Sequence, residues 1–361
     1  MPAAVQGDGD EQDGNHAERA VEQNLPGADI ADQTDQRKLV IASFSLVLVT
    51  GLVMTGLALA GAATYTAAFV AAIISGVFWV TDMPFRRKPM VASLDQQHVP
   101  AALSLDVTTS NAMRTLGPLA GGAIYQVAGL AGAYALATLI YAVCLALAVG
   151  TSASPRAPSS GKASRASAIG YLLPPPELLR NRRFLIIIGV TLVYNLWCFP
   201  LIGMVPVFAA KAFGFNAAWV GILTALEALG STIGAFVLGF VLTQRRLFTV
   251  YFLGTLAFLT VLLGLSLWLV PNAAFAAFVL LGFASSCFAA TQYTLVYTTA
   301  PPEMRGRAAG FLATAIGMGV IGALNAGFLF ERFSSASAML IMAVEGILSL
   351  AVLGLLWRRA Q

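Results

Sequence analysis

Charged residues are scarce in this chain of 361 residues, in which Asp, Glu, Lys and Arg together make up only 11%. A soluble domain carries roughly 25% charged residues, so most of the surface of this protein faces something other than water. Hydrophobic residues make up 58% of the chain, and they occur in long blocks separated by short polar breaks. Because a bilayer core about 30 Å thick requires ~20 apolar residues per helix, this pattern predicts an integral membrane protein.

Histidine and cysteine are also rare, and their positions argue against an active site. His16 and His98 lie in polar segments, whereas Cys144, Cys198 and Cys287 lie in separate apolar blocks without metal-ligand spacing, as expected of small core residues. The chain has no Ser–His or Cys–His constellation, and no glycine-rich phosphate loop ending in Lys-Ser or Lys-Thr. We therefore expect no catalytic residue, no metal, no cofactor and no enzymatic activity.

The apolar blocks predict an all-α fold, a polytopic bundle of about ten spanning helices in two pseudo-repeated halves. The predicted spans are residues 39–61, 64–85, 104–127, 131–150, 184–210, 216–242, 247–270, 273–299, 307–330 and 336–357. The segment 151–183 is rich in Ser, Ala, Pro and Arg, and contains three consecutive prolines that no continuous helix accommodates. We expect this segment to be a linker between a bundle of four helices (39–150) and a bundle of six (184–357), flanked by a polar N-terminal segment (1–38) and a short tail (358–361).

Basic residues concentrate in alternate breaks between the predicted spans. The main clusters are Arg37 and Lys38, Arg86 to Lys88, Arg156 to Arg183, Arg245 and Arg246, Arg305 and Arg307, and Arg358 and Arg359. Loops on the cytoplasmic side of a membrane carry such an excess of Lys and Arg. The linker and the C-terminus are therefore predicted to be cytoplasmic, in a multi-pass protein of the inner cell membrane. Since topology explains the basic residues, we expect membrane lipids as partners and no nucleic acid.

Several local motifs resemble those of one transporter family. The segment Gly27–Lys38 combines a glycine, aspartates and a basic pair, and Thr81–Arg87 closes the second predicted span with Asp82 and Arg86. The third span contains Leu105-Asp106, then Asn111 and Arg114, then Gly117-Pro118-Leu119-Ala120-Gly121-Gly122. These motifs resemble the loop between helices 2 and 3, helix 4 and helix 5 of the major facilitator superfamily. An arginine three residues before Gly-Pro-x-x-Gly-Gly is similar to the branch of drug and siderophore exporters.

The resemblance implies a secondary active transporter, most simply a monomer that exports a small amphiphilic molecule such as a drug, siderophore or metabolite in exchange for protons. In the family, such carriers work by alternating access, with the two halves rocking about a site near the membrane midplane. The first span of this sequence is similar to the family's helix 3, so the family's first two helices have no counterpart. A truncated, transport-inactive member of the family is therefore an alternative. A membrane-embedded transferase is a remote one, since the acids within spans are not clustered.

Besides Glu345 in the last span, which is a weaker candidate, two ionisable residues lie deep within predicted spans, where charge is costly and functional sites are expected. Arg114 lies about ten residues into its span, either handling substrate or pairing with a structural partner. Glu227 lies near the middle of 216–242, where desolvation disfavours the charged carboxyl, so it is either a proton-coupling site or a structural hydrogen-bonding group. With Asn111, which precedes Arg114 in the same span, they are candidates for the substrate and proton path.

A second set of charges lies at predicted cytoplasmic helix ends. Asp82 and Arg86 are four residues apart and share a helix face, and Asp106 begins the next span. By the resemblance, these residues with Asp32 and Arg37 hold a cytoplasmic gate, and the alternative is a solvated cluster of little energetic weight.

Aromatic, polar and small residues complete the candidates. Tyr194, Asn195 and Trp197 are predicted either to line the pocket of an amphiphilic ligand or to face lipid and neighbouring helices. Small residues four apart allow helix backbones to approach closely in membranes, which predicts helix-packing faces. The predicted packing residues are Gly117, Pro118, Gly121, Gly230 and Gly234.

Overall fold

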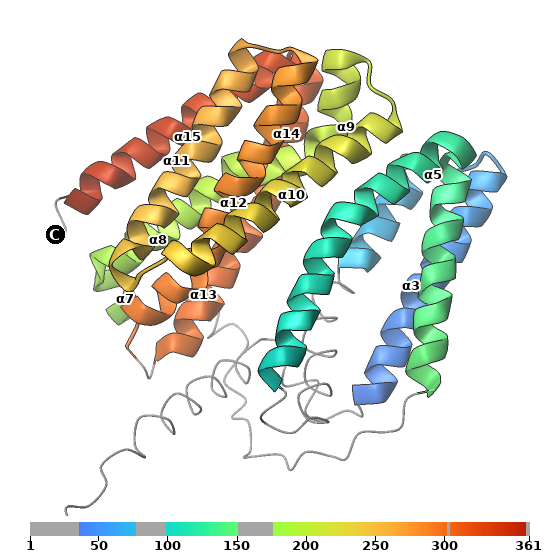
Figure 1. Cartoon of the computed structure of the whole chain (residues 1–361), viewed down its shortest axis with the longest axis horizontal. Helices are drawn as coiled ribbons and strands as arrows, with labels where there is room; N and C mark the ends of the chain where they lie inside the picture. Colours follow the sequence, from blue (N-terminus) through green and yellow to red (C-terminus); the bar gives the residue numbers. More distant parts are fainter. Residues whose placement is uncertain (1–35, 77–98, 151–175, 302–303, 359–361) are drawn as a thin grey trace, which may run out of the picture. The chain divides into compact units, whose positions relative to one another are not determined.

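The computed structural model describes residues 36–76, 99–150, 176–301 and 304–358, which form helices joined by short connections (Figure 1). No strand occurs within these ranges. Contacts group the chain into an N-terminal unit, formed by Met1–Leu105 and Leu130–Gly170, and a C-terminal unit, formed by Asp106–Gly129 and Tyr171–Gln361. The predicted all-α fold is confirmed.

The N-terminal unit contains α3 (Gln36–Leu59), a shorter apolar helix at Tyr65–Gly76 and the second part of α5 (Val99–Gly150). Of the first part of α5, residues Asp106–Gly129 belong to the C-terminal unit instead. The break between the two parts is Gly129, whose φ of 65° and ψ of −164° are readily accessible only to glycine. All of α5 was predicted to belong to an N-terminal bundle of four helices, and the division into bundles of four and six stays a prediction.

The C-terminal unit contains the remaining described helices. They are α7 (Pro176–Arg180), α8 (Arg182–Val193), η2 (Tyr194–Cys198), α9 (Pro200–Phe213), α10 (Ala217–Val241), η3 (Gln244–Arg246), α11 (Leu247–Leu267), α12 (Pro271–Thr299), α13 (Arg305–Gly317), α14 (Gly319–Arg332) and α15 (Ser335–Arg358). Large side chains such as Phe184, Phe208, Phe258, Phe278 and Phe330 are fully buried between these helices. The unit therefore has a close-packed apolar core of its own.

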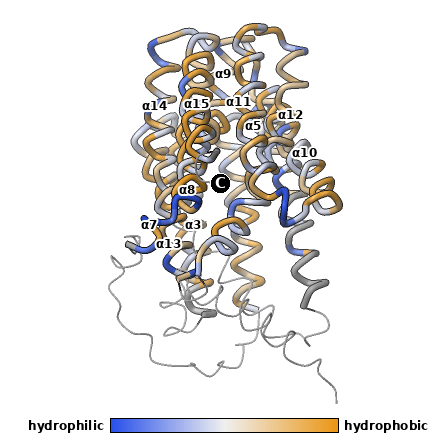
Figure 2. Tube along the Cα trace, turned by 90° about the vertical axis from the view of Figure 1, so that its left-hand side faces the viewer, coloured by the Kyte–Doolittle hydropathy of each residue, from blue (hydrophilic) through white to orange (hydrophobic). Residues whose placement is uncertain are grey.

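Eight helical stretches within the described residues are long and apolar enough to span a membrane. Hydrophobic residues run along most of the length of the helices (Figure 2). The predicted spans 104–127 and 131–150 form one of these stretches, Ala112–Gly150, which Gly129 interrupts. The predicted span 64–85 is described only in part, as the shorter helix Tyr65–Gly76.

The predicted span 184–210 is one membrane-crossing stretch, but its helix changes winding in the middle. Pro200 has no backbone N–H and cannot donate to the carbonyl four residues earlier, at Leu196. The turn before it widens to a π-helix, in which the Phe199 N–H donates to the Tyr194 carbonyl at 2.9 Å. Such single π-turns are frequent at functional sites, and this one contains all three predicted pocket residues.

Candidate transport site

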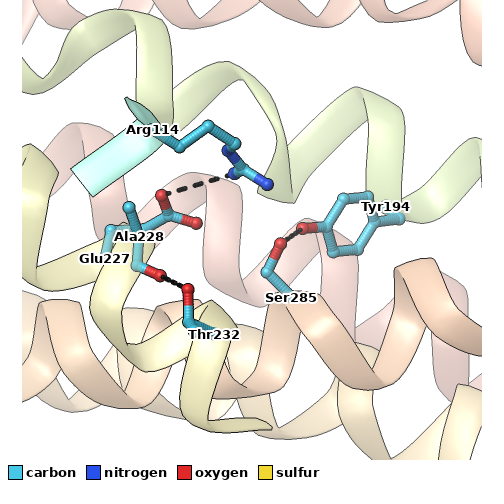
Figure 3. Close-up of polar contacts among 6 residues, drawn as sticks. All are labelled: Arg114, Tyr194, Glu227, Ala228, Thr232 and Ser285. Atoms are coloured by element: carbon cyan, nitrogen blue, oxygen red, sulfur yellow. Dashed lines mark hydrogen bonds and ion pairs between the residues drawn. The ribbon is translucent and has the colours of Figure 1, made fainter. Parts of the chain in front are cut away.

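The structure brings together the two deepest ionisable residues of the predicted path. Nη2 of Arg114, on α5, lies 3.8 Å from Oε2 of Glu227, on α10. The Glu227 side chain is 6% exposed and the Arg114 side chain 56% exposed, so the acid is buried and the base accessible. Figure 3 shows the guanidinium directed toward the carboxylate.

Small residues explain why α5 and α10 approach closely enough for this ion pair. A Cβ atom at Gly221 would collide with the carbonyl oxygen of Pro118, and one at Gly122 would collide with the carbonyl oxygen of Ala217. The two backbones are thus in direct contact on the C-terminal side of Arg114 along α5. Because Pro118 has no N–H, it also leaves the Arg114 carbonyl without its usual helical donor, which loosens α5 at the residue that carries the charge.

Glu227 is held from its other side by α12. A Cβ atom at Gly282 would overlap the Glu227 carbonyl oxygen, and one at Gly230 would overlap the Val279 carbonyl oxygen. At Gly234, a Cβ atom would meet the Ser286 hydroxyl. This row of glycines brings α10 and α12 into backbone contact, so the position of the Glu227 main chain is tightly determined.

The two oxygens of the Glu227 carboxyl have different surroundings. Oε2 faces Arg114, whereas Oε1 is buried and has no hydrogen-bond partner among the described residues. A distance of 3.8 Å is also longer than a hydrogen bond between charged groups, which measures about 2.7–2.9 Å. The ion pair is therefore an electrostatic contact without a tight hydrogen bond. A proton or a ligand can separate the two groups without the loss of a strong hydrogen bond.

Tyr194 lies beside this pair and connects it to α12. Its hydroxyl donates to the Ser285 hydroxyl at 2.7 Å, and its ring stacks on Phe288 with 3.7 Å between centroids. In Figure 3 the Arg114 guanidinium lies between the Glu227 carboxylate and the Tyr194–Ser285 pair. The aromatic ring and the two hydroxyls thus give the ion pair an amphiphilic neighbourhood.

Asn195 belongs to a buried polar cluster whose other members, Thr191, Tyr251 and Gln292, were not predicted from the sequence. Its Nδ2 donates to the Thr191 carbonyl at 2.9 Å, while the Thr191 hydroxyl lies 2.6 Å from the Tyr251 hydroxyl and accepts from Gln292 Nε2 at 3.4 Å. Of these residues, Gln292 could have been recognised from the sequence, because a polar amide within an apolar span is unusual. Thr191 gave no signal, since a Thr hydroxyl often bonds its own helix backbone, as it does here to Ile187.

Trp197 faces a different part of the C-terminal unit from Tyr194. Its indole Nε1–H donates to Oε2 of Glu345, on α15, at 2.9 Å. The three predicted pocket residues therefore diverge: Tyr194 contacts α12, Asn195 bonds within its own segment, and Trp197 contacts α15.

The predicted gate charges are mostly beyond what the structure describes. Asp32, Asp82 and Arg86 lie outside the described residues. Arg37 lies in the first turn of α3, and Asp106 is half-buried in α5. The gate stays a prediction.

The other predicted path and packing residues of this region lie on α5. Asn111 is one turn or less from Arg114 on this helix. A Cβ atom at Gly117 or Gly121 would meet no atom of the described residues within 4 Å, in contrast to Gly122. The packing role predicted for Gly117 and Gly121 is therefore untested, and the observed contact uses their neighbours.

Comparison with known proteins identifies the family. The sequence profile of the Major Facilitator Superfamily matches residues 24–268 and 199–361. The chain belongs to this superfamily. The predicted resemblance to the superfamily is thereby confirmed, and the protein is a multi-pass membrane transporter. Its place in the branch of drug and siderophore exporters stays a prediction.

Solved transporter structures share the superfamily fold with this chain. The nucleoside transporter NupG is similar with a TM-score of 0.73 at 14% identity, over 94% of this chain and 88% of that one. The POT family transporter PepTSo has a TM-score of 0.65 at 14% identity, over 96% and 88%. A bacterial homolog of the human lysosomal transporter Spinster, inward-facing and unoccupied, has a TM-score of 0.63 at 14% identity, over 94% and 86%. At such low sequence identity, the likeness shows a shared fold and no more. No curated protein sequence matches significantly.

Proposed function

We propose that this superfamily member is a proton-coupled antiporter that exports a small amphiphilic molecule, such as a drug, siderophore or metabolite, from the cytoplasm. The observation that carries the proposal is the ion pair between Arg114 and the buried carboxyl of Glu227, 3.8 Å apart. It joins α5 to α10 with one carboxylate oxygen facing the cation and the other without a hydrogen-bond partner among the described residues.

A proton on Glu227 changes the contact between the two helices. The charged carboxylate attracts Arg114, and this attraction disappears when the carboxyl takes up a proton. Because the accessible Arg114 side chain then loses its partner, the two protonation states favour different positions of α5 relative to α10. A proton that binds the two conformations with different affinity shifts their populations, which is the physical requirement for coupling.

The substrate path in this proposal runs past the ion pair and the Tyr194–Ser285 pair. The Tyr194 ring offers an apolar face, and the hydroxyls offer polar contacts for one end of an amphiphile. The charge cluster of Asp32, Arg37, Asp82, Arg86 and Asp106 holds the cytoplasmic gate. The excess of basic residues in alternate loops supports an inner-membrane orientation with the linker and the C-terminus in the cytoplasm, and the unit of function is the monomer.

Glu227→Gln tests the proposal because it retains the shape of the side chain and removes its ability to take up a proton. We expect proton-driven accumulation of exported compounds in everted membrane vesicles to fall by at least ~100-fold, as for loss of an essential proton-transfer group. Membrane insertion and yield should be unchanged. The measurement is uptake of a panel of amphiphilic compounds with and without a pH gradient.

The matched control is Glu177→Gln, the same chemical change at an exposed residue of α7. This variant should transport as the unmodified protein does. Full proton-driven accumulation by Glu227→Gln would remove Glu227 from the mechanism, and with it the proposed role of the ion pair.

A further inference from the structure

A second carboxyl lies within the apolar region of this protein, at Glu345 on α15. The helix Ser335–Arg358 has 24 residues and a length of about 36 Å, and Glu345 lies near its middle. It is the only acidic residue of this helix. Its side chain is exposed, and so are Val344, Leu348 and Val352 on the same helix. Glu345 is thus an exposed carboxyl among exposed aliphatic residues, near the middle of a helix long and apolar enough to span a membrane.

The local packing of α15 against η2 gives this carboxyl its one hydrogen-bond partner among the described residues. A Cβ atom at Gly346 would lie 3.3 Å from Cβ of Trp197, so the glycine allows α15 to pack closely on the π-turn. The indole Nε1–H of Trp197 then donates to Oε2 of Glu345 at 2.9 Å. Among the described residues Glu345 makes no ion pair with any Lys or Arg.

We propose that Glu345 and Trp197 form a membrane-facing site that binds a lipophilic cation. The carboxylate supplies the negative charge that a cation needs in hydrocarbon, where an unpaired charge is costly. The indole orients the carboxylate through its N–H and offers a π-face that attracts cations. Because the surrounding surface is apolar, the ligand reaches the site through the lipid, which selects quaternary ammonium, phosphonium and protonated amphiphilic amine compounds over small hydrated cations.

This site differs from the Arg114–Glu227 pair in its chemistry. There the accessible group is a cation that repels other cations, whereas at α15 the accessible group is an acid without a basic partner among the described residues. A second copy of the chain is a poorer occupant for the α15 face, because two-fold symmetry brings the same surfaces of two copies together and would place two carboxylates near each other in a medium of low dielectric. We further infer that export substrates enter this site from the bilayer. This role rests on the proposed export function.

Direct binding of tetraphenylphosphonium to the purified full chain in lipid nanodiscs tests the site. Glu345→Gln should weaken binding by at least ~10-fold, and Trp197→Phe should weaken it less, since Phe retains an aromatic face and loses the N–H. Glu177→Gln, the same change at an exposed residue of α7, should bind tetraphenylphosphonium as the unmodified chain does. Equal binding by Glu345→Gln and the unmodified chain would overturn the proposal, whatever the transport activity of Glu227→Gln proves to be.

Chemical labelling of the unmodified chain provides a second test that does not depend on the folding of a variant. Dicyclohexylcarbodiimide partitions into lipid and reacts with protonated carboxyls that it reaches there. Peptide mapping by mass spectrometry should find the adduct on Glu345, and tetraphenylphosphonium should reduce its formation. Labelling of Glu345 that the cation does not reduce would overturn the proposal.

Discussion

At the scale of single residues, the ion pair between Arg114 and Glu227 is the feature on which the proposed coupling depends. The two residues come from spans more than a hundred positions apart in the sequence, and each was recognised because charge within an apolar span is costly. Their pairing was not predicted, because it depends on which faces of α5 and α10 meet. The glycine and proline contacts at Gly122, Gly221 and Pro118 decide that question, and they become meaningful only in three dimensions.

A double-mutant cycle measures whether the two charges interact in the folded protein. Arg114→Gln, Glu227→Gln and the double variant should show a coupling free energy of about 1 kcal/mol, because each single variant leaves the opposite group without its partner. The measurement is thermal unfolding in detergent. The cycle of Arg114→Gln with Glu177→Gln serves as the reference and should be additive. Additivity in both cycles would show that the contact contributes nothing to the folded state.

At the scale of helices, glycine determines how closely α10 and α12 approach. Gly282 faces the main chain of Glu227 so closely that no Cβ atom fits. Gly282→Ala should therefore destabilise the protein by about 1–3 kcal/mol, the usual cost of overpacking, and should lower transport because the carbonyl it displaces belongs to Glu227. Thermal unfolding and vesicle uptake measure the two effects.

Gly239→Ala, on α10 itself, is the control for this prediction. A Cβ atom there meets nothing within 4 Å in the described part of the chain. Its expected effect is neutral or slightly stabilising, by up to ~1 kcal/mol, because alanine favours helix over glycine. If both alanine variants unfolded at the temperature of the unmodified protein, the backbones of α10 and α12 would lie farther apart at Gly282 than in the structure.

The helices themselves were the most predictable level of the structure. Each block of about twenty apolar residues was recognised as a span, because the thickness of the bilayer sets that length. Interruptions within the blocks were harder to predict. Pro200 indicated a break in its span, but the widened turn Tyr194–Cys198 that separates Tyr194 from Trp197 follows from backbone hydrogen bonding that no periodicity reveals. The Thr191–Gln292 contact joins α8 to α12 and likewise depends on packing.

At the scale of the whole molecule, family membership and composition agree on a membrane transporter, and the proposed antiport is the claim that most needs a direct measurement. That measurement is the uptake of each compound of the amphiphilic panel by the purified chain in proteoliposomes under an imposed pH gradient. Each uptake is measured with and without a protonophore. For a proton-coupled antiporter we expect accumulation of at least one compound, driven by the gradient and abolished by the protonophore. Accumulation that the protonophore leaves unchanged, or no accumulation of any compound by correctly inserted protein, would contradict it.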